Sequence, residues 1–356
     1  MKILLLTKYS RTGASSRLRM LQYIPFLEQE GNTVDVANML DEEYLVRLYN
    51  GNGSTVWHYI RYYFSRLIWL FKIRKYDVVW LEKEIFPYLP AWAEKALRLC
   101  GVKIVVDYDD AIFHSYDMSP NNLIKKILSD KIARVMRYSS CVVAGNKYLA
   151  EYASEAGAEK VFVVPTVIDL DRYAVKKNGL NNKLVVGWMG SPSTQKYVLE
   201  IKDALIAQCK AHGAKIILVG ADTNLENEFQ GVDIEVLPWS EDKEVEMIQQ
   251  MDIGIMPLKD GPWEKGKCGY KLIQYMACAV PVIASPVGVN IDIVNGSKSG
   301  LLADSLEGWE QSLGYLLSSA DSRERLGNSG RRSVENHYSV QVQASSLMRI
   351  MCEIAN

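Results

Sequence analysis

The stretch from residue 252 to residue 290 limits the fold of this chain more strongly than any other. Its residues 253–258 form an apolar run typical of a buried strand, and a loop rich in lysine and glycine follows. Apolar side chains then recur at helical spacing until Pro281, which is expected to end the helix before a second apolar strand at 282–284. Strand, helix and strand in this order predict a β-α-β unit, and so an α/β fold with a parallel sheet.

The loop before this helix carries three lysines, Lys265, Lys267 and Lys271. Loops of this kind lie at the carboxyl ends of parallel strands, where α/β sheets bind their ligands. The N-terminus of a helix already favours an anion through its dipole and its unpaired N–H groups. Together these features predict a phosphate or diphosphate site.

A second loop has the same chemistry. An apolar strand at 184–188 leads into a loop with glycine, hydroxyl side chains and a lysine at the start of the next helix. A solvated lysine at a helix start is the alternative interpretation, but two such loops predict one site. The candidate phosphate ligands are Gly190, Ser191, Ser193, Thr194 and Lys196.

The helix at 272–277, the segment 281–285 and Gly288 resemble the nucleotide-binding segment of the retaining glycosyltransferases of family 4. The resemblance implies a GT-B fold, in which two Rossmann-like domains with parallel sheets face a central cleft. Members of this family usually carry two glutamates eight positions apart, one near the sugar and one on the nucleotide ribose. Here the second position is Gln274 and the first is Gly266, with Glu264 two residues earlier, so the loop GKCGYK marks a variant subgroup.

The resemblance also implies roles for individual residues. Lys196 matches the lysine that binds the donor diphosphate, and Lys271 would supply the second positive charge. Gln274 would hydrogen-bond the ribose, and Lys267, Gly269 and Tyr270 would complete the donor site. The donor would be a nucleotide-diphosphate sugar, with no cofactor. The two lysines and the helix N-termini would stabilise the leaving diphosphate in place of a metal ion. No pair of carboxylates would be needed, because a diphosphate oxygen can accept the proton of the acceptor.

The first strand and its loop predict a further ligand-facing edge. Residues 2–7 form an apolar strand, and the small-residue loop 10–16 follows without the GxGxxG pattern of dinucleotide sites. The resemblance places this loop toward the cleft, so Gly13 and Arg17 would meet the acceptor or the donor phosphate. An exposed helix face is the alternative for Arg17.

Three carboxylates, Asp107, Asp109 and Asp110, follow an apolar strand at 103–106. Buried like charges repel one another, so packing alone gives no reason for them. Helix capping is one alternative. A metal site is another, but a weaker one, because no His or Cys spacing accompanies the acids. The resemblance implies that Asp109 or Asp110 orients sugar or acceptor hydroxyls and that His114 faces the cleft.

Residues 56–76 predict a helix that binds an anionic membrane. Eight aromatic and five basic residues alternate there without any acid, which suits an interfacial amphipathic helix. A core helix with solvated basic residues is the alternative. Residues 123–137 are expected to form a second basic helix, a further candidate for the membrane surface. The basic residues of the two segments are Arg61, Arg66, Lys72, Arg74 and Lys75, and Lys125, Lys126, Lys131, Arg134 and Arg137.

The bulk composition narrows the class of protein. A chain of 356 residues accommodates two domains, and a net charge of −1 argues against a nucleic-acid binder. Six scattered cysteines, with no leader-like start and no apolar run of membrane-spanning length, indicate a cytoplasmic protein. The polar stretch 173–183 is the clearest linker, and it divides residues 1–170 from residues 171–339. The resemblance implies that the C-terminal helix, within 340–356, returns to the first domain.

With these observations, the resemblance implies a hexosyl or related transferase. It would move a sugar with retention of configuration to a lipid-linked saccharide or another saccharide acceptor in bacterial surface polysaccharide or glycan synthesis. It would act at the inner face of the cytoplasmic membrane. Two alternatives remain, a nucleotide-sugar epimerase on the same fold and a non-catalytic partner subunit that binds nucleotide-sugar.

Overall fold

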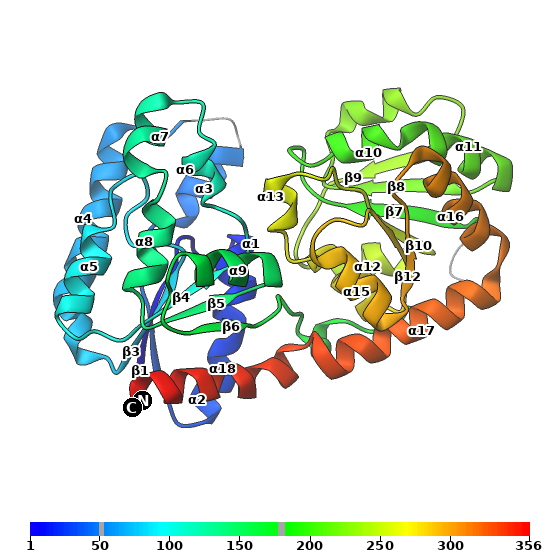
Figure 1. The fold of residues 1–356 in the computed structure, drawn as a ribbon. Helices are drawn as coiled ribbons and strands as arrows, with labels where there is room; N and C mark the ends of the chain where they lie inside the picture. The colour runs from blue at the N-terminus through cyan, green and yellow to red at the C-terminus, as the bar shows by residue number, and fades with distance from the viewer. Residues whose placement is uncertain (50–52, 177–181) are drawn as a thin grey trace. The chain divides into compact units, whose positions relative to one another are not determined.

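A computed structural model describes residues 1–49, 53–176 and 182–356. The chain forms two compact units (Figure 1). The N-terminal unit comprises Met1–Val167, Gly266–Cys268 and Val340–Asn356, and the C-terminal unit comprises Ile168–Lys265 and Gly269–Ser339. Residues 266–268 thus group with the N-terminal unit, which differs from the division expected from the sequence. The centre of the predicted linker, residues 177–181, lies outside the described residues.

The N-terminal unit contains a six-stranded parallel sheet in the order β2-β1-β3-β4-β5-β6. Apolar side chains bury both faces of its central strands, as expected for a parallel sheet covered by helices on both sides. The strands are β1 (Lys2–Leu6), β2 (Thr33–Val36), β3 (Val78–Glu82), β4 (Ile104–Tyr108), β5 (Cys141–Ala144) and β6 (Val161–Val163).

Helices cover the two faces of this sheet. Helices α5, α8 and α9 pack on one face around Val79 and Val106, whereas α2 and the C-terminal α18 pack on the other around Trp80. The helices of this unit are α1 (Ala14–Arg19), α2 (Ile24–Gln29), α3 (Glu42–Tyr49), α4 (Val56–Lys72), α5 (Trp92–Leu99), α6 (His114–Asp117), α7 (Asn122–Leu128), α8 (Lys131–Tyr138), α9 (Lys147–Glu155) and α18 (Val340–Ala355). The single helix expected over 123–137 is therefore wrong, because α7 ends at Leu128 and α8 begins at Lys131.

The C-terminal unit has a second six-stranded parallel sheet in the order β12-β11-β10-β7-β8-β9. Its strands are β7 (Val185–Met189), β8 (Lys215–Val219), β9 (Asp233–Leu237), β10 (Ile253–Met256), β11 (Val282–Ala284) and β12 (Gly300–Leu302). Its helices are α10 (Lys196–Glu200), α11 (Lys202–His212), α12 (Glu244–Gln249), α13 (Pro262–Lys265), α14 (Tyr270–Ala277), α15 (Val289–Ser297), α16 (Leu306–Ser318) and α17 (Ala320–His337). Short 3-10 turns occur in the two units at η1 (Leu21–Tyr23), η2 (Ile73–Lys75), η3 (Leu170–Arg172) and η4 (Thr223–Glu228).

The predicted β-α-β unit is confirmed as β10-α14-β11. The two strands pair in parallel, with Gly254 opposite Val282. The helix ends earlier than expected, at Ala277, and Ala279 then takes a left-handed conformation with φ 59°. Pro281 therefore does not end the helix, but lies directly before β11.

Each sheet reverses its strand order at one place. In the N-terminal unit the reversal lies between β1 and β3, and in the C-terminal unit it lies between β7 and β10. Chain connections leave to opposite sides at such a switch point, which opens a crevice at the carboxyl ends of the two strands. The fold thus provides one candidate ligand-binding edge in each unit.

Candidate active site

The switch point of the C-terminal unit brings the two predicted phosphate loops together. The loop after β7 begins at Gly190, and α14 follows the loop after β10. A Cβ atom on Gly190 would lie 2.9 Å from Lys271 Nζ, and that ammonium lies 4.7 Å from the centre of the Trp188 ring. Glycine at 190 is required, because the same Cβ would lie 2.1 Å from the Trp188 ring. Lys271 therefore lies against the first loop.

The hydroxyl groups of the loop after β7 hold its shape. Ser191 and Ser193 are exposed and their Oγ atoms lie 2.9 Å apart, while Thr194 Oγ1 donates to the carbonyl of Ser191 over 3.0 Å. Lys196 is exposed at the first residue of α10, and its ammonium lies 5.0 Å from the centre of the Tyr197 ring. This arrangement combines hydroxyl groups and an ammonium at one strand end, which is suitable chemistry for an anion.

The start of α14 is compact because of Gly269. This residue caps the helix with φ 65°, and a Cβ there would lie 2.4 Å from Ile293 Cδ1. The glycine lets the chain turn tightly into the helix. The adjoining Tyr270 hydroxyl lies 3.5 Å from the hydroxyl of Tyr173.

Gln274, the predicted ribose ligand, lies inside a buried network. Its side chain is buried, and Nε2 donates to Tyr173 Oη over 2.9 Å. Tyr173 donates in turn to Glu244, which also accepts a bond of 3.0 Å from Trp239 Nε1. Burial raises the pKa of Tyr173. In this structure the amide positions Tyr173, and a ribose contact stays a prediction.

Sequence reasoning missed Glu244. Its side chain is buried, although it lies in the first turn of α12, where the acidic sequence suggests an exposed position. No spacing rule in the sequence connects it to Tyr173, which is 71 residues away. The only local contact is with Trp239, five residues earlier in the chain.

Packing explains the glycine at position 266. A Cβ there would lie 2.4 Å from Ala111 Cβ and 2.6 Å from Ala111 N, so no longer side chain fits. Glu264, two residues earlier, lies in the C-terminal unit and accepts a hydrogen bond from Tyr197 Oη. Burial and this carboxylate both raise the pKa of Tyr197.

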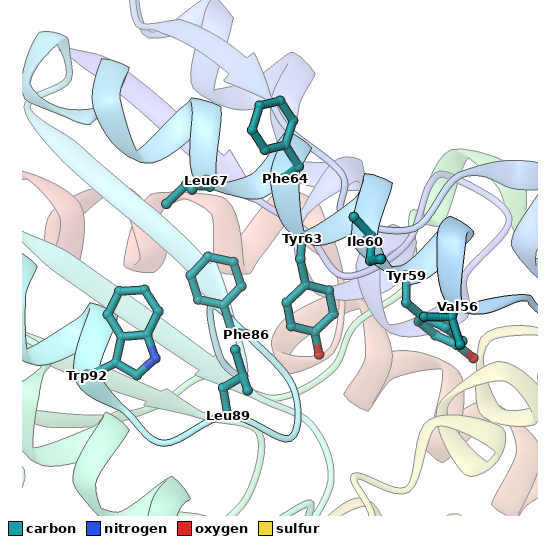
Figure 2. Close-up of a pocket in the computed structure, with 9 residues that line it drawn as sticks. All are labelled: Val56, Tyr59, Ile60, Tyr63, Phe64, Leu67, Phe86, Leu89 and Trp92. Atoms are coloured by element: carbon teal, nitrogen blue, oxygen red, sulfur yellow. The ribbon is translucent and has the colours of Figure 1, made fainter.

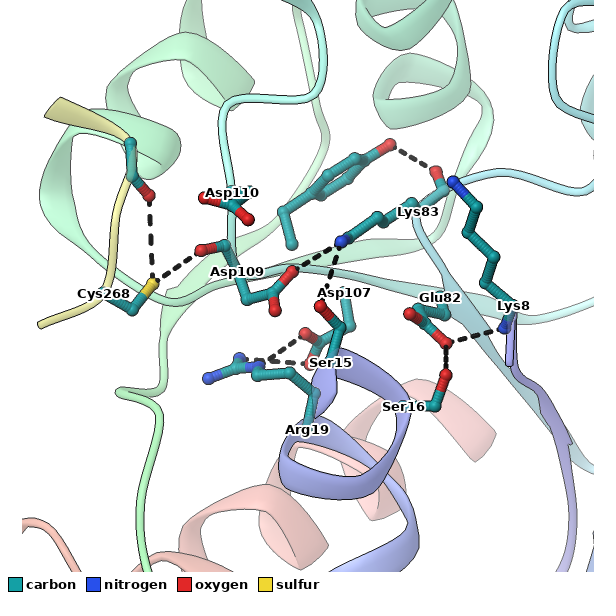
Figure 3. Close-up of polar contacts among 12 residues, drawn as sticks. Lys8, Ser15, Ser16, Arg19, Glu82, Lys83, Asp107, Asp109, Asp110 and Cys268 are labelled. Atoms are coloured by element: carbon teal, nitrogen blue, oxygen red, sulfur yellow. Dashed lines mark hydrogen bonds and ion pairs between the residues drawn. The ribbon is translucent and has the colours of Figure 1, made fainter. Parts of the chain in front are cut away.

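Residues 266–268 are bound to the N-terminal unit by polar contacts. Asn146 Nδ2 donates to the carbonyls of Gly266 and Lys267, each over 3.0 Å. Cys268 Sγ donates to the carbonyl of Asp109 over 3.1 Å (Figure 3). The ammonium of Lys267, a predicted donor ligand, lies 3.6 Å from Asp110.

The switch point of the N-terminal unit is filled by charged side chains that pair with one another (Figure 3). Asp107 pairs with Arg19 at 2.7 Å, and both side chains are buried. Asp109 pairs with Lys83 at 2.9 Å, and Lys83 also donates to Ser15 Oγ over 3.3 Å. The expectation that packing gives no reason for these acids is wrong, because each acid has a cation beside it.

These pairs set the charge states in the cluster. Burial opposes ionisation of Asp109, but the ammonium of Lys83 outweighs it and lowers the pKa to about 2. Burial raises the pKa of Glu82, even though its carboxylate accepts bonds from Ser16 Oγ and from the Lys8 amide. Asp109 is thus held ionised, whereas Glu82 binds a proton more readily than an exposed glutamate does.

The remaining predicted residues of this unit also have structural partners. His114 begins α6, with Nδ1 at 3.0 Å from Asp117 and Nε2 at 2.9 Å from Tyr148 Oη. Gly13 precedes α1, where a Cβ would lie 2.3 Å from Tyr9 Cβ. Arg17 is buried and donates to the carbonyl of Arg11, so the exposed helix face considered for it is wrong.

Helix α4 carries much of its apolar surface toward solvent. Trp57, Phe64 and Phe71 are 78, 63 and 82% exposed, and they follow one another along one face of the helix. Two basic residues that were expected at a membrane surface, Arg66 of α4 and Lys131 of α8, are instead buried. Arg66 donates to the carbonyls of Ala37 and Thr7, and Lys131 pairs with Glu84. Burial lowers the pKa of Arg66 to about 10.

Residues 1–49, 53–176 and 182–356 contain no group of three His, Cys, Asp or Glu side chains placed to hold a metal ion. Over the same residues, none of the helices combines the length and the apolar character needed to cross a membrane.

Comparisons with known proteins agree with this architecture. Residues 182–319 match the family model described as glycosyl transferases group 1. The capsular polysaccharide biosynthesis glycosyltransferase CapM of Staphylococcus aureus is 26% identical over 171 residues, which are 46% of this chain and 44% of CapM. The chain spans less than half the length of the curated relatives it matches.

Solved structures extend the likeness to the whole chain. HepE of Anabaena, crystallised in complex with UDP-glucose, is 16% identical with a TM-score of 0.72, covering 99% of this chain and 100% of HepE. Sucrose-phosphate synthase of Thermosynechococcus elongatus is 14% identical with a TM-score of 0.73, covering 99% of each chain. The protein therefore has the GT-B fold, and its residues 182–319 resemble the glycosyl transferases group 1.

Proposed function

We propose that the protein is a glycosyltransferase that moves a sugar from a nucleotide-diphosphate sugar to an acceptor in polysaccharide biosynthesis. The observation that carries this proposal is the meeting of two loops at the β7–β10 switch point. There Lys271 lies against Gly190, and the hydroxyl groups of the first loop precede Lys196. Both loops fall within the glycosyl transferases group 1 domain. The likeness to CapM, a capsular polysaccharide enzyme, supports the class of product.

The chemistry follows from a diphosphate leaving group. Lys196, Lys271 and the N-terminus of α14 stabilise the charge that develops as the bond between the sugar carbon and the phosphate oxygen breaks. The acceptor oxygen forms its bond to the same carbon from the same face, and its proton passes to the departing phosphate oxygen. Configuration is then retained, and no metal ion is needed. Asp109 and Asp110 would orient hydroxyl groups of the acceptor or the sugar.

The acceptor in this proposal is a lipid-linked saccharide at the inner face of the cytoplasmic membrane. The exposed aromatic face of α4 supports this, since aromatic and basic side chains on one helix suit the membrane interface. Lys72, Arg74 and Lys75 at the end of this helix are exposed and would meet anionic headgroups. The protein would attach peripherally and reversibly.

A turnover assay tests the proposal. UDP-glucose, GDP-glucose and ADP-glucose, each radiolabelled, would be incubated with the protein and lipid extracts of bacterial membranes. We expect one donor to transfer label to lipid, activity to survive EDTA, and the product to show the anomeric configuration of the donor. Loss of activity in EDTA with recovery in Mg²⁺ or Mn²⁺ would instead make the acids at 107–110 metal ligands. Donor binding without transfer would favour the non-catalytic partner subunit.

A further inference from the structure

An apolar groove lies between α4 and α5 in the N-terminal unit (Figure 2). Its volume is about 510 Å³, within the range of small-molecule sites. Apolar side chains of α4 form one wall, and side chains from the β3–α5 connection and from α5 form the other. The residues that define it best are Ile60, Tyr63 and Leu67 on α4, and Phe86, Leu89 and Trp92 opposite them.

Stacked rings keep this groove open. Phe86 stacks on Tyr63 at 5.6 Å and on Trp92 at 5.5 Å, with interplanar angles of 16° and 19°. Three rigid rings in contact resist collapse of the walls, so the groove is formed before any ligand arrives. The Tyr63 hydroxyl donates to the Pro87 carbonyl and is already satisfied. The groove is thus suited to a hydrocarbon and poorly suited to a peptide, whose buried N–H and C=O groups would lack partners.

The surroundings of the groove indicate where such a hydrocarbon comes from. The groove lies beside the exposed residues Trp57, Ile68 and Phe71 of α4. Helix α4 contains no acidic residue, and the one acid of α5, Glu94, is buried. Exposed basic residues on these helices and on η2 are Lys72, Arg74, Lys75 and Lys95, whereas Arg61 pairs with Asp41 and Arg98 pairs with Glu159. The charge on this face complements anionic lipid headgroups, which carry hydrocarbon chains into its reach.

We propose that this groove binds a single hydrocarbon chain of an anionic membrane lipid. The chain would leave the bilayer and lie along α4, while the basic residues hold the phosphate headgroup. The proposal rests on the membrane attachment proposed above and adds to it a defined site for one chain. A lipid held in this way would fix the protein on the bilayer more specifically than a flat amphipathic helix does.

Calorimetric titration with dodecyl phosphate below its critical micelle concentration tests the site without a bilayer. We expect the wild-type protein to bind about one molecule. Leu89→Asp places a carboxylate in the groove at a residue that is already 37% exposed, and should weaken binding at least tenfold. Leu99→Asp is the matched control, because Leu99 is an exposed leucine that does not line the groove. It should bind as the wild type does.

A second variant guards against misfolding. Ile60→Trp would fill the groove from an exposed position on α4, and should also weaken binding of dodecyl phosphate at least tenfold. Equal binding by wild type, Leu89→Asp and Ile60→Trp, or no binding by the wild type, would overturn the proposal. So would a dimer in sedimentation experiments that Leu89→Asp dissociates, since a second copy would then occupy the groove.

Liposome flotation separates this proposal from the attachment on which it rests. Phe71→Ser removes an aromatic ring outside the groove, and should reduce binding to anionic liposomes while leaving dodecyl phosphate binding unchanged. If the wild type fails to float with liposomes yet binds dodecyl phosphate at the groove, membrane attachment fails and the site for the chain stands.

Discussion

The two switch points have the same topology but use their charges differently. In the N-terminal unit Arg19 and Asp107 are buried and paired, and buried Lys83 pairs with Asp109, which is largely covered. In the C-terminal unit Lys196, Ser191 and Ser193 are exposed at the loop after β7. A buried charge that has a partner inside the protein mainly maintains the fold, whereas an exposed cation at a strand end can meet an anionic ligand. Pairing at the first edge thus mainly maintains the fold, and the exposed groups of the second edge, called the donor edge below, support the proposal that it binds the donor.

The largest expected effect concerns the switch point of the N-terminal unit, called the structural edge below, where Arg19 pairs with Asp107. Arg19→Met leaves Asp107 buried without its cation, and should lower the free energy of unfolding by about 3–5 kcal/mol. Urea unfolding would measure it. Lys196→Met is the matched change at the exposed edge and should alter the free energy of unfolding by less than about 0.5 kcal/mol. Similar losses in both variants would break the comparison.

The next prediction concerns the proposed donor site, formed by the loop after β7 and the start of α14. Lys196→Ala and Lys271→Ala should each lower kcat by about 10²- to 10³-fold, because each removes a charge that stabilises the leaving diphosphate. Steady-state assays with the donor found by the turnover screen would measure this. Lys210→Ala, an exposed lysine of α11, is the control and should be as active as the wild type. Wild-type rates in both loop variants would contradict the diphosphate site.

The sequence predicted the meeting of the two loops at the β7–β10 edge better than the pairing of the acids at the N-terminal edge, for a physical reason. The signals of the donor edge are local: an apolar strand, small and hydroxyl residues, and a lysine at a helix start lie within a dozen residues of one another. The partners at the acidic edge are distant in sequence, and Arg19 lies 88 residues from Asp107. The three acids therefore look unpaired until the parallel sheet brings β1 and β4 into one layer.

The same limit explains the basic residues of α4. Sequence periodicity gives an aromatic and basic helix, and the structure has that helix. Periodicity does not show that Arg66 turns inward to the carbonyls of Ala37 and Thr7, because those partners belong to the β1 and β2 edge. Gly266 is similar, since only the position of Ala111 shows why no side chain fits there.

Lowering the pH should lower the free energy of unfolding through the Lys83–Asp109 pair. The pKa of Asp109 is lowered to about 2 in the folded protein, from 3.8. A lowered folded pKa gives stability that is complete above the unfolded value and is lost as the pH falls from about 4 to about 2, by about 2 kcal/mol in all. Urea unfolding between pH 6 and pH 2 would follow this loss. Asp109→Asn should flatten that part of the profile, and an unchanged slope would contradict the Lys83–Asp109 pairing.

The smallest effect compares one serine from each edge. Ser15→Ala removes an acceptor of Lys83 Nζ inside the paired cluster, so it should cost about 1 kcal/mol in the free energy of unfolding. Ser193→Ala removes an exposed hydroxyl, so it should leave unfolding unchanged and weaken binding of the nucleoside diphosphate by a few-fold. Urea unfolding and calorimetric titration of both variants give four values. If Ser15→Ala weakens nucleotide binding and Ser193→Ala lowers stability, the division of roles between the two edges is reversed.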